Sequence, residues 1–456
     1  MKSIGDTLPE DQVKGSSDHE HGQTMPSDRQ EASPAEPPEQ HHSHHAEGMH
    51  GMSMPEISSA SRLLMQQSSG TAMNPASAPM SMIMLRAGSW SLMFHGLAFL
   101  TDIQQTGPRG GDKFVSTNWF MGMAEHSFGR GSLMMRTMLS LDPATVTQRR
   151  YPELFQTGET AFGRPIVDGQ HPHDLFMELS LQYAVKLTEK TSFNLYLAPV
   201  GDPALGPVAF PHRISATEIP QAALAHHLQD STHIANDVLT VGVTRGMWRL
   251  EASGFHGAEP NENRWNIDQG ALNSWSTRLA VAPTSNWSGQ VSVGRVKRPE
   301  ALENLDVVRS TASITYYKPL SAGSWAASLV WGRNHKTVQQ QDTNSYLAES
   351  VFQFHKQNYL TGRVELLDKD ELFEDQPEIK EHLEKTAGSV FRVSAYTIGY
   401  TRDIKFFPGV QTGIGGNVSW FKIPSALQPF YGDHPVAFCV FMRFRLKQDA
   451  PVSHGH

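Results

Sequence analysis

The stretch of this chain best suited to chemistry is a run of interleaved histidines and methionines between residues 41 and 54. Imidazole nitrogens bind several transition metals and thioether sulfurs suit Cu(I), so this mixture favours copper over zinc or magnesium. The alternative is a solvated low-complexity tail that binds no metal. Neither interpretation requires a cofactor. If the segment binds metal, copper ions are the expected ligand. The expected metal ligands are His41, His42, His44, His45, Met49, His50, Met52 and Met54.

Two further groups of histidine and aspartate have spacings suited to binding a cation. The first group is closely spaced just before a stretch that begins with an acidic residue, whereas the second has spacings of four and three. Those spacings predict one face of a short helix that starts near Pro220. Nitrogen and oxygen ligands of this kind suit Zn, Cu or Ni. The alternative is that long loops fold inwards and use these side chains as hydrogen-bonding struts. The residues are His171, His173 and Asp174 in the first group, and His226, Asp230 and His233 in the second.

A hydrolytic site also deserves consideration, because Asp230, Ser231 and His233 are the residue types of a catalytic triad. They are neighbours in the sequence, however, and no nucleophile-elbow motif surrounds the serine. We therefore expect no catalytic residues and no enzyme.

The elements that position these residues follow from an alternation of apolar and polar side chains that recurs from Trp90 to Leu446. The clearest segment runs from Met177 to Leu187, where odd-numbered residues are mostly apolar and even-numbered residues mostly polar. A helix would mix the two sets, whereas a strand separates them onto two faces. Repeated in series, the pattern predicts a transmembrane β-barrel, in which each strand shows one face to lipid and the other to a polar lumen.

The connections between these segments alternate between tight turns, such as Thr188 to Thr191, and long loops, such as Asp142 to Leu175 and Gly201 to Asn236. Bacterial barrels have short periplasmic turns and longer extracellular loops. The turns predict about 16 strands. The expected fold class is all-β, a transmembrane antiparallel β-barrel of about 16 strands with a disordered N-terminal arm.

Composition supports this division of the chain. Residues 1–80 are rich in Ser, Pro, Glu, His and Met and are expected to form a disordered periplasmic arm; residues 81–447 form the barrel, and residues 448–456 form a polar tail. Hydrophobic residues make up 39% of the chain and the mean hydropathy is −0.39, without an apolar run near the roughly 20 residues of a spanning helix. The net charge of −8, with no basic stripe, excludes nucleic acid as a partner.

Aromatic residues mark one rim of the predicted barrel. Trp248, Trp287 and Trp325 each follow a short turn, and Tyr316 and Tyr317 precede one. Amphipathic rings in such positions are typical of the girdle at the lipid headgroup level.

The polar faces of the strands place charges of both signs in the predicted lumen. Facing rows of opposite charge can produce a transverse field that selects small polar solutes. The same charges can instead pair with each other and plug a narrow barrel. A barrel of about 16 strands is wide enough for an aqueous channel unless loops fill it. The expected pore-lining residues are Arg249, Glu251, Arg309, Arg363, Glu365, Arg443 and Arg445.

A family resemblance follows from these motifs. The arm segment Gly48-Met49-His50-Gly51-Met52 ahead of a barrel resembles the copper-resistance protein B family, and the loops Gln170 to Phe176 and His226 to His233 resemble those of uncharacterised porin-like outer-membrane proteins. The resemblance implies a bacterial outer-membrane location and a porin-like passage for small solutes or metal ions. The alternative is a non-conducting barrel that anchors a copper-sequestering arm.

Both ends of the chain depart from the pattern of such proteins. The last strand, Val436 to Leu446, resembles the closing strand that the barrel-assembly machinery reads, but a polar tail follows it. Residues 1–22 lack the apolar core of a secretory signal, so the signal is expected outside this sequence or the start site is misassigned. The expected partners are outer-membrane lipid, the assembly machinery and metal ions, and the oligomeric state is left open.

Overall fold

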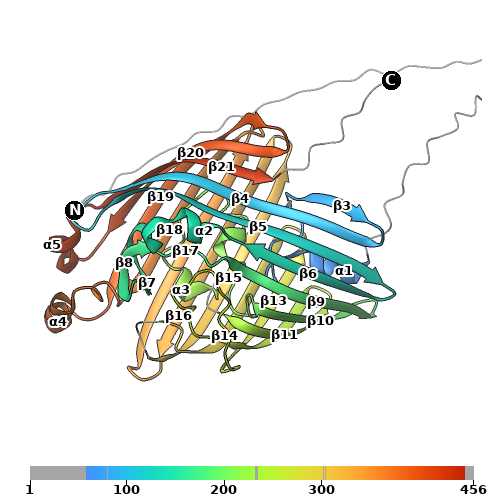
Figure 1. The fold of residues 1–456 in the computed structure, drawn as a ribbon, viewed down its shortest axis with the longest axis horizontal. Helices are drawn as coiled ribbons and strands as arrows, with labels where there is room; N and C mark the ends of the chain where they lie inside the picture. Colours follow the sequence, from blue (N-terminus) through green and yellow to red (C-terminus); the bar gives the residue numbers. More distant parts are fainter. Residues whose placement is uncertain (1–57, 80, 232–234, 301, 303, 447–456) are drawn as a thin grey trace, which may run out of the picture. The chain divides into compact units, whose positions relative to one another are not determined.

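A computed structural model describes residues 58–79, 81–231, 235–300, 302 and 304–446 of the chain. Sixteen antiparallel strands close into a barrel (Figure 1), which confirms the fold class predicted from the alternation. The barrel strands are β4 (Trp90–Gln105), β5 (Asp112–Phe128), β6 (Gly131–Leu139), β9 (Phe176–Thr188), β10 (Thr191–Val200), β11 (Asn236–Arg245), β12 (Trp248–His256), β13 (Ser274–Thr284), β14 (Trp287–Lys297), β15 (Asp306–Leu320), β16 (Gly323–Lys336), β17 (Gln341–Phe354), β18 (Asn358–Lys369), β19 (Phe391–Phe407), β20 (Val410–Lys422) and β21 (Val436–Leu446).

Shorter elements lie before the barrel and in its long connections. They are α1 (Ser59–Met65), β1 (Gln67–Ser69), β2 (Ala72–Met73), β3 (Ile83–Ala87), α2 (Asp142–Thr145), η1 (Thr147–Arg149), β7 (Tyr151–Ala161), β8 (Arg164–Gln170), η2 (Phe210–His212), α3 (His226–Gln229), α4 (Pro377–Thr386), η3 (Ser425–Leu427) and α5 (Gln428–Tyr431). Tight turns and longer connections alternate, so the barrel has a short-turn end and a long-loop end. The connection between β16 and β17 differs from the expected long loop, because strand pairing continues to a tight turn at residues 337–340. No helix among the described residues is long and apolar enough to cross a membrane.

The barrel closes where its last strand meets its first. β21 pairs with β20 on one side and with β4 on the other, from Ala437 opposite Gln105 to Arg445 opposite Leu97. β4 continues beyond this pairing, and β3 pairs with its remaining residues, from Trp90 to Phe94.

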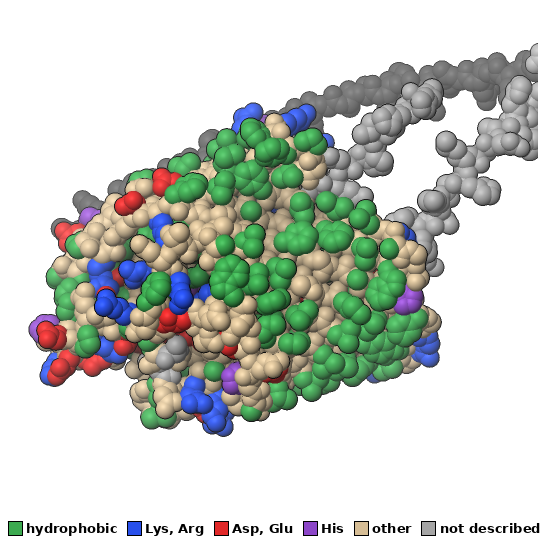
Figure 2. Space-filling model, viewed as in Figure 1, with side chains coloured by type: hydrophobic (Ala, Val, Ile, Leu, Met, Phe, Trp, Pro, Cys, Tyr) green, Lys and Arg blue, Asp and Glu red, His purple; other side chains and the backbone are tan. Residues whose placement is uncertain are grey.

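Burial along the strands is the reverse of that in a soluble protein. On β9, the polar residues Glu178 and Gln182 are buried, whereas Leu179 and Leu181 have exposed fractions of 36% and 40%. Figure 2 shows hydrophobic side chains over the middle of the barrel wall, with charged side chains gathered towards its ends. An apolar belt outside and a polar interior are what a lipid surround requires of a barrel.

Aromatic side chains gather at the short-turn end, as the sequence predicts. The ring of Tyr316 lies 4.5 Å from that of Trp287 and 5.3 Å from that of Trp325, between centroids, and both tryptophans are exposed. Tyr317 does not belong to this girdle, because successive residues of a strand point to opposite faces. Its side chain is buried, and its carbonyl accepts a hydrogen bond from Ser77.

Residues 201–231 and 235, the described part of the connection between β10 and β11, fold into the barrel, and we call them the luminal loop. Its Gly206 N–H donates to Ser292 on β14, Ser215 hydrogen-bonds to Ser328 on β16, and Gln221 donates to Asn417 on β20. These strands lie at different positions around the wall. The luminal loop therefore spans the lumen, as expected if long loops fold inwards.

Residues 58–79 also pack inside the barrel, which corrects the prediction of a disordered arm reaching residue 80. Ser58 caps α1 through its hydroxyl, and α1 buries Leu63 and Leu64. The chain then crosses the inner wall, where Arg136 of β6 donates to the carbonyls of Gln67 and Gly70. We call residues 58–79 the plug segment.

Candidate functional site

Arginines on the barrel wall bind the backbone of the luminal loop. Arg278 donates to the carbonyl of Gly206 at 3.0 Å, and Arg363 donates to the carbonyls of Gln221 and Ala222, each at 3.1 Å. Arg309 donates in the same way to the carbonyl of Asp230. Hydrogen bonds from a charged donor are stronger than neutral ones, so these contacts fix the course of the loop across the lumen.

The luminal loop is also held by buried ion pairs. Glu349 on β17 lies between Arg213 of the loop and Arg363 of β18, with Nε to carboxylate oxygen distances of 2.5 Å and 3.2 Å. Glu218 of the loop pairs with Arg443 and Arg445 of β21. Burial of charges is tolerated only when they are paired. Two networks of paired charges therefore join the loop to the wall.

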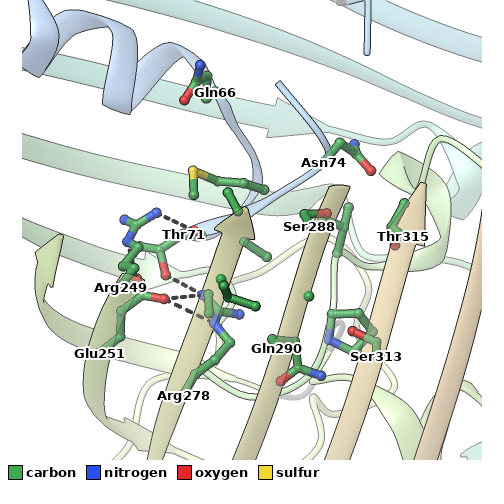
Figure 3. A pocket seen from close by; sticks show the side chains of 18 of the residues that line it. Gln66, Thr71, Asn74, Arg249, Glu251, Arg278, Ser288, Gln290, Ser313 and Thr315 are labelled. Atoms are coloured by element: carbon green, nitrogen blue, oxygen red, sulfur yellow. Dashed lines mark hydrogen bonds and ion pairs between the residues drawn. The ribbon is translucent and has the colours of Figure 1, made fainter. Parts of the chain in front are cut away.

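A third network surrounds a small cavity between the plug segment and the wall (Figure 3). Glu251 accepts hydrogen bonds from Arg278 at 2.8 Å and 3.0 Å and lies 3.1 Å from Nε of Arg249. Both arginines also reach Thr71 of the plug segment, Arg249 at its carbonyl and Arg278 at its hydroxyl. The cavity has a volume of about 150 Å³. That is room for several water molecules, not for an open channel.

The structure places all seven predicted pore-lining residues on the inner side of the wall, where they pair with other charges or with the luminal loop. Glu365, for example, accepts a hydrogen bond from the Ala225 N–H of the loop. This arrangement matches the alternative in which paired charges fill the barrel. The sequence alone does not reveal it, because the partners lie 100 or more residues away in several of these contacts.

Some of the predicted metal ligands lie outside the described residues, and others have hydrogen-bond partners of their own. His41 to Met54 and His233 lie outside the described residues. His173 is hydrogen-bonded through Nδ1 to Asp142 at 2.8 Å, and Asp174 accepts a hydrogen bond from Arg264 at 3.2 Å. Neither side chain belongs to the group around His171 described below.

The predicted helix face is wrong for Asp230. α3 covers only His226 to Gln229, and Asp230 follows it in an extended conformation, with φ −132° and ψ −171°. Asp230 does not belong to the group of ligand atoms that gathers around His226. Asp230 instead lies against the wall, where its carbonyl binds Arg309.

His171 and His226, one from each predicted group, nevertheless come together, and His227 joins them. Ligand nitrogens of the three rings all lie within 4.8 Å of one another. We call these residues the histidine cluster. His227 was missed because the helix-face argument selected only residues at spacings of four and three. The signal that could have identified His227 is its position directly after His226. Both residues belong to the single turn of α3, and both rings reach His171.

Burial sets the charge of the two inner imidazoles. Desolvation lowers the pKa of His171 to about 4 and the pKa of His226 well below its usual value. Both rings are therefore neutral at pH 7, the form in which imidazole binds metals.

No protein-family model matches this chain, and neither does any curated protein. Similar solved structures include an anion-selective porin from Comamonas acidovorans, at 10% identity over 78% of this chain and 100% of that one, with a TM-score of 0.46. OmpF of Salmonella typhi is similar at 10% identity over 80% and 100%, with a TM-score of 0.47, and OprB of Pseudomonas putida at 9% over 78% and 94%, also with 0.47. Because identities and TM-scores are this low, the barrel is assigned from its own strand pairings alone.

Proposed function

We propose that this protein is a bacterial outer-membrane barrel that passes small polar solutes when the plug segment leaves the lumen. The apolar belt and the aromatic girdle support insertion in a membrane, and a closed barrel satisfies its backbone hydrogen bonds without an exposed edge. The long-loop end then faces outwards and the short-turn end faces the periplasm.

The observation that carries the proposal is the difference in how the lumen's two occupants are held. The luminal loop has ion pairs to β17 and β21 through Arg213 and Glu218. The plug segment contributes no Asp, Glu, Lys or Arg to an ion pair among the described residues; its carbonyls and hydroxyls accept hydrogen bonds from Arg136, Arg249 and Arg278. The plug segment is therefore the occupant that is less costly to displace.

Displacement of the plug segment would open the existing cavity. Thr71 and Ala72 form one side of that cavity, and Gln290 and Thr315 of β14 and β15 form part of the other. Without the plug segment, this space joins the short-turn end of the barrel. The exposed wall then carries Arg249, Glu251 and Arg278, charges of both signs that favour small polar or charged solutes over apolar ones.

Single-channel recording in a planar bilayer tests this proposal on the full chain. The double substitution Leu63→Ser and Leu64→Ser removes apolar burial from the plug segment without changing the wall, and large-to-small changes at buried leucines cost about 2–5 kcal/mol each. We expect the variant to open more often, or for longer, than the parent protein. Leu372→Ser, at an equally buried leucine in the connection between β18 and β19, is the matched control and should leave the openings unchanged.

Two results would contradict the proposal. If neither the parent nor the plug variant conducts, while both show heat-modifiable migration, the barrel is an anchor and the copper-sequestering alternative is favoured. If the control opens as often as the plug variant, the openings reflect general destabilisation.

A further inference from the structure

The histidine cluster lies at the long-loop end, where separate connections of the barrel meet. His171 follows β8 in the connection between β6 and β9, whereas His226 and His227 belong to α3 of the luminal loop. The ring centroids of His226 and His227 are 4.2 Å apart, and those of His171 and His227 are 6.2 Å apart. Residues 55 or more positions apart in the sequence thus present imidazoles to one small volume.

Backbone carbonyls set the protonation of two of these rings. His171 Nδ1 lies 3.0 Å from the carbonyl of Pro172, and His226 Nδ1 lies 2.6 Å from the carbonyl of Ala223. A carbonyl can only accept, so Nδ1 carries the proton and Nε2 has the lone pair. A hydrogen bond from the other ring nitrogen to a carbonyl is the usual support of a metal-binding histidine, because it fixes both tautomer and ring orientation.

A glycine opposite the cluster makes room for it. Gly158 of β7 has a φ of +119°, and a Cβ at this position would lie 2.7 Å from Cε1 of His227. Any other residue would push the imidazole away from its neighbours. The backbone of β7 therefore approaches His227 more closely than a side chain at residue 158 would permit.

Carboxylates surround the imidazoles. Glu159 lies 3.1 Å from Nε2 of His171, and Glu300 lies 3.8 Å from Nδ1 of His227. Ligand atoms of His227, Glu259 and Glu300 also lie within 4.8 Å of one another. Glu159 also forms an ion pair with Arg264, so Glu259 and Glu300 are the carboxylates that bring negative charge to the neutral imidazoles, a setting that favours a bound cation.

We propose that the histidine cluster binds one divalent transition-metal ion of the imidazole-preferring class, Zn²⁺, Cu²⁺ or Ni²⁺. Three imidazoles, with a neighbouring carboxylate or water as fourth ligand, are a familiar set for these ions, and the described residues of the cluster include no sulfur ligand to favour Cu(I). Nitrogens bound to zinc at about 2.0–2.1 Å lie roughly 3.4 Å from each other in tetrahedral geometry, so the rings need only close inwards by about 1 Å. The ion would join the luminal loop to the connection between β6 and β9.

The proposed metal site is a further property, separate from the proposed passage of solutes. An experiment can contradict one of these two proposals and leave the other intact. Metal binding requires no conductance, because the cluster lies at the long-loop end and shares no residue with the plug segment. Conductance requires no metal for the same reason.

Equilibrium titration of the full chain with Zn²⁺ alone, and separately with Cu²⁺ alone, tests the proposal. The seven arm histidines are first changed to Ala, so that the arm contributes no imidazoles; they are His19, His21, His41, His42, His44, His45 and His50. We expect one tightly bound ion per chain. His171→Ala and His226→Ala should each weaken binding by more than about 100-fold, since loss of an outer supporting group alone costs 10–100-fold.

His173→Ala is the matched control, because it removes an imidazole two residues from His171 that bonds to Asp142 instead. It should retain the ion with unchanged affinity. X-ray absorption on the metal-loaded parent gives a readout that does not depend on whether the variants assemble, and three nitrogen ligands of imidazole type are expected. Absence of a tight ion in the parent, fewer than two imidazoles around it, or equal affinity in the His171→Ala and His173→Ala variants would each overturn the proposal.

Discussion

Arg213 of the luminal loop and Glu349 of β17 form an ion pair in which both side chains are almost completely withdrawn from solvent, with exposed fractions of 1% and 0%. Glu349 also binds Arg363 of the neighbouring strand. The carboxylate of Glu349 therefore pairs with an arginine of the loop and an arginine of the wall at the same time.

The substitution Arg213→Ala should loosen the loop without leaving Glu349 unpaired, because Arg363 remains beside it. Loss of a hydrogen bond to a charged group costs about 1.5–3 kcal/mol, so the midpoint of heat-modifiable migration should fall and current fluctuations should increase. Arg295→Ala is the control. It breaks an ion pair with Asp306 in which the arginine is 55% exposed, and such pairs contribute about 0–1 kcal/mol. Equal effects of the two substitutions would mean that Arg213 does not restrain the loop.

Gly332 of β16 lies directly against α3. A Cβ there would lie 2.1 Å from the carbonyl oxygen of Leu228, so Gly332→Ala should displace the luminal loop. We expect a changed single-channel conductance and faster proteolysis within the loop. At Gly362 of β18 the nearest atom to an added Cβ is 3.9 Å away, and Gly362→Ala should behave as the parent. A Gly332→Ala protein with parental proteolysis would place the loop elsewhere.

Leu329 faces outwards at the middle of β16, with an exposed fraction of 58%. Leu329→Arg should impair assembly, because an arginine at the bilayer midplane costs a barrel about 2–4 kcal/mol. Leu320, at the short-turn end of β15, is also exposed, and Leu320→Arg should cost only about 0–1 kcal/mol. Refolding yield in lipid vesicles measures the difference. Similar yields would remove Leu329 from the lipid-facing surface.

Asp202 is the second residue of the luminal loop and lies beside Gly70 of the plug segment. Burial, together with the carboxylates of Glu178 and Asp230, raises the pKa of Asp202 to about 7. The folded protein therefore binds a proton that the unfolded chain releases near pH 4, so stability from this group falls as pH rises from about 4 to 7, by about 1.4 kcal/mol per pH unit. Asp202→Asn should flatten the pH dependence of the unfolding midpoint across that range. An unchanged slope would exclude Asp202 as its source.

The arm prediction remains open to direct measurement on the full chain. Changing Met49, Met52 and Met54 to Leu keeps the apolar volume but removes the thioethers, so Cu(I) affinity should fall while Cu(II) affinity is retained. Competition with a chromogenic Cu(I) chelator measures both forms of the protein. Retained Cu(I) affinity would favour the solvated-tail interpretation.

The strands were predictable because each of their faces meets a uniform environment, lipid or lumen, and the period of two records that contrast residue by residue. Leu179 and Gln182 show it within four positions. The contents of the lumen carry no such period. The plug segment contains one short helix and two short strands, and what buries Leu64 is a wall that forms from later residues.

The histidine cluster was predictable only in part, for a related reason. Residue types and their spacing identified His171 and His226 as candidate ligands, but their convergence depends on two connections folding towards each other. The position of His227 depends further on the backbone conformation of Gly158. The spacing of residues along one segment predicts neither the convergence of the two connections nor the backbone conformation of Gly158.

The pairing of β3 with β4 has a consequence for aggregation. β21 reaches only as far as Leu97 on β4, so residues 90–94 would otherwise present a free edge with unpaired N–H and C=O groups. Such an edge is a template for addition of a strand from another molecule. By folding back onto these residues, β3 caps the seam, and a chain cut or mutated within Ile83 to Ala87 should be prone to edge-to-edge association even when its sixteen-stranded wall is intact.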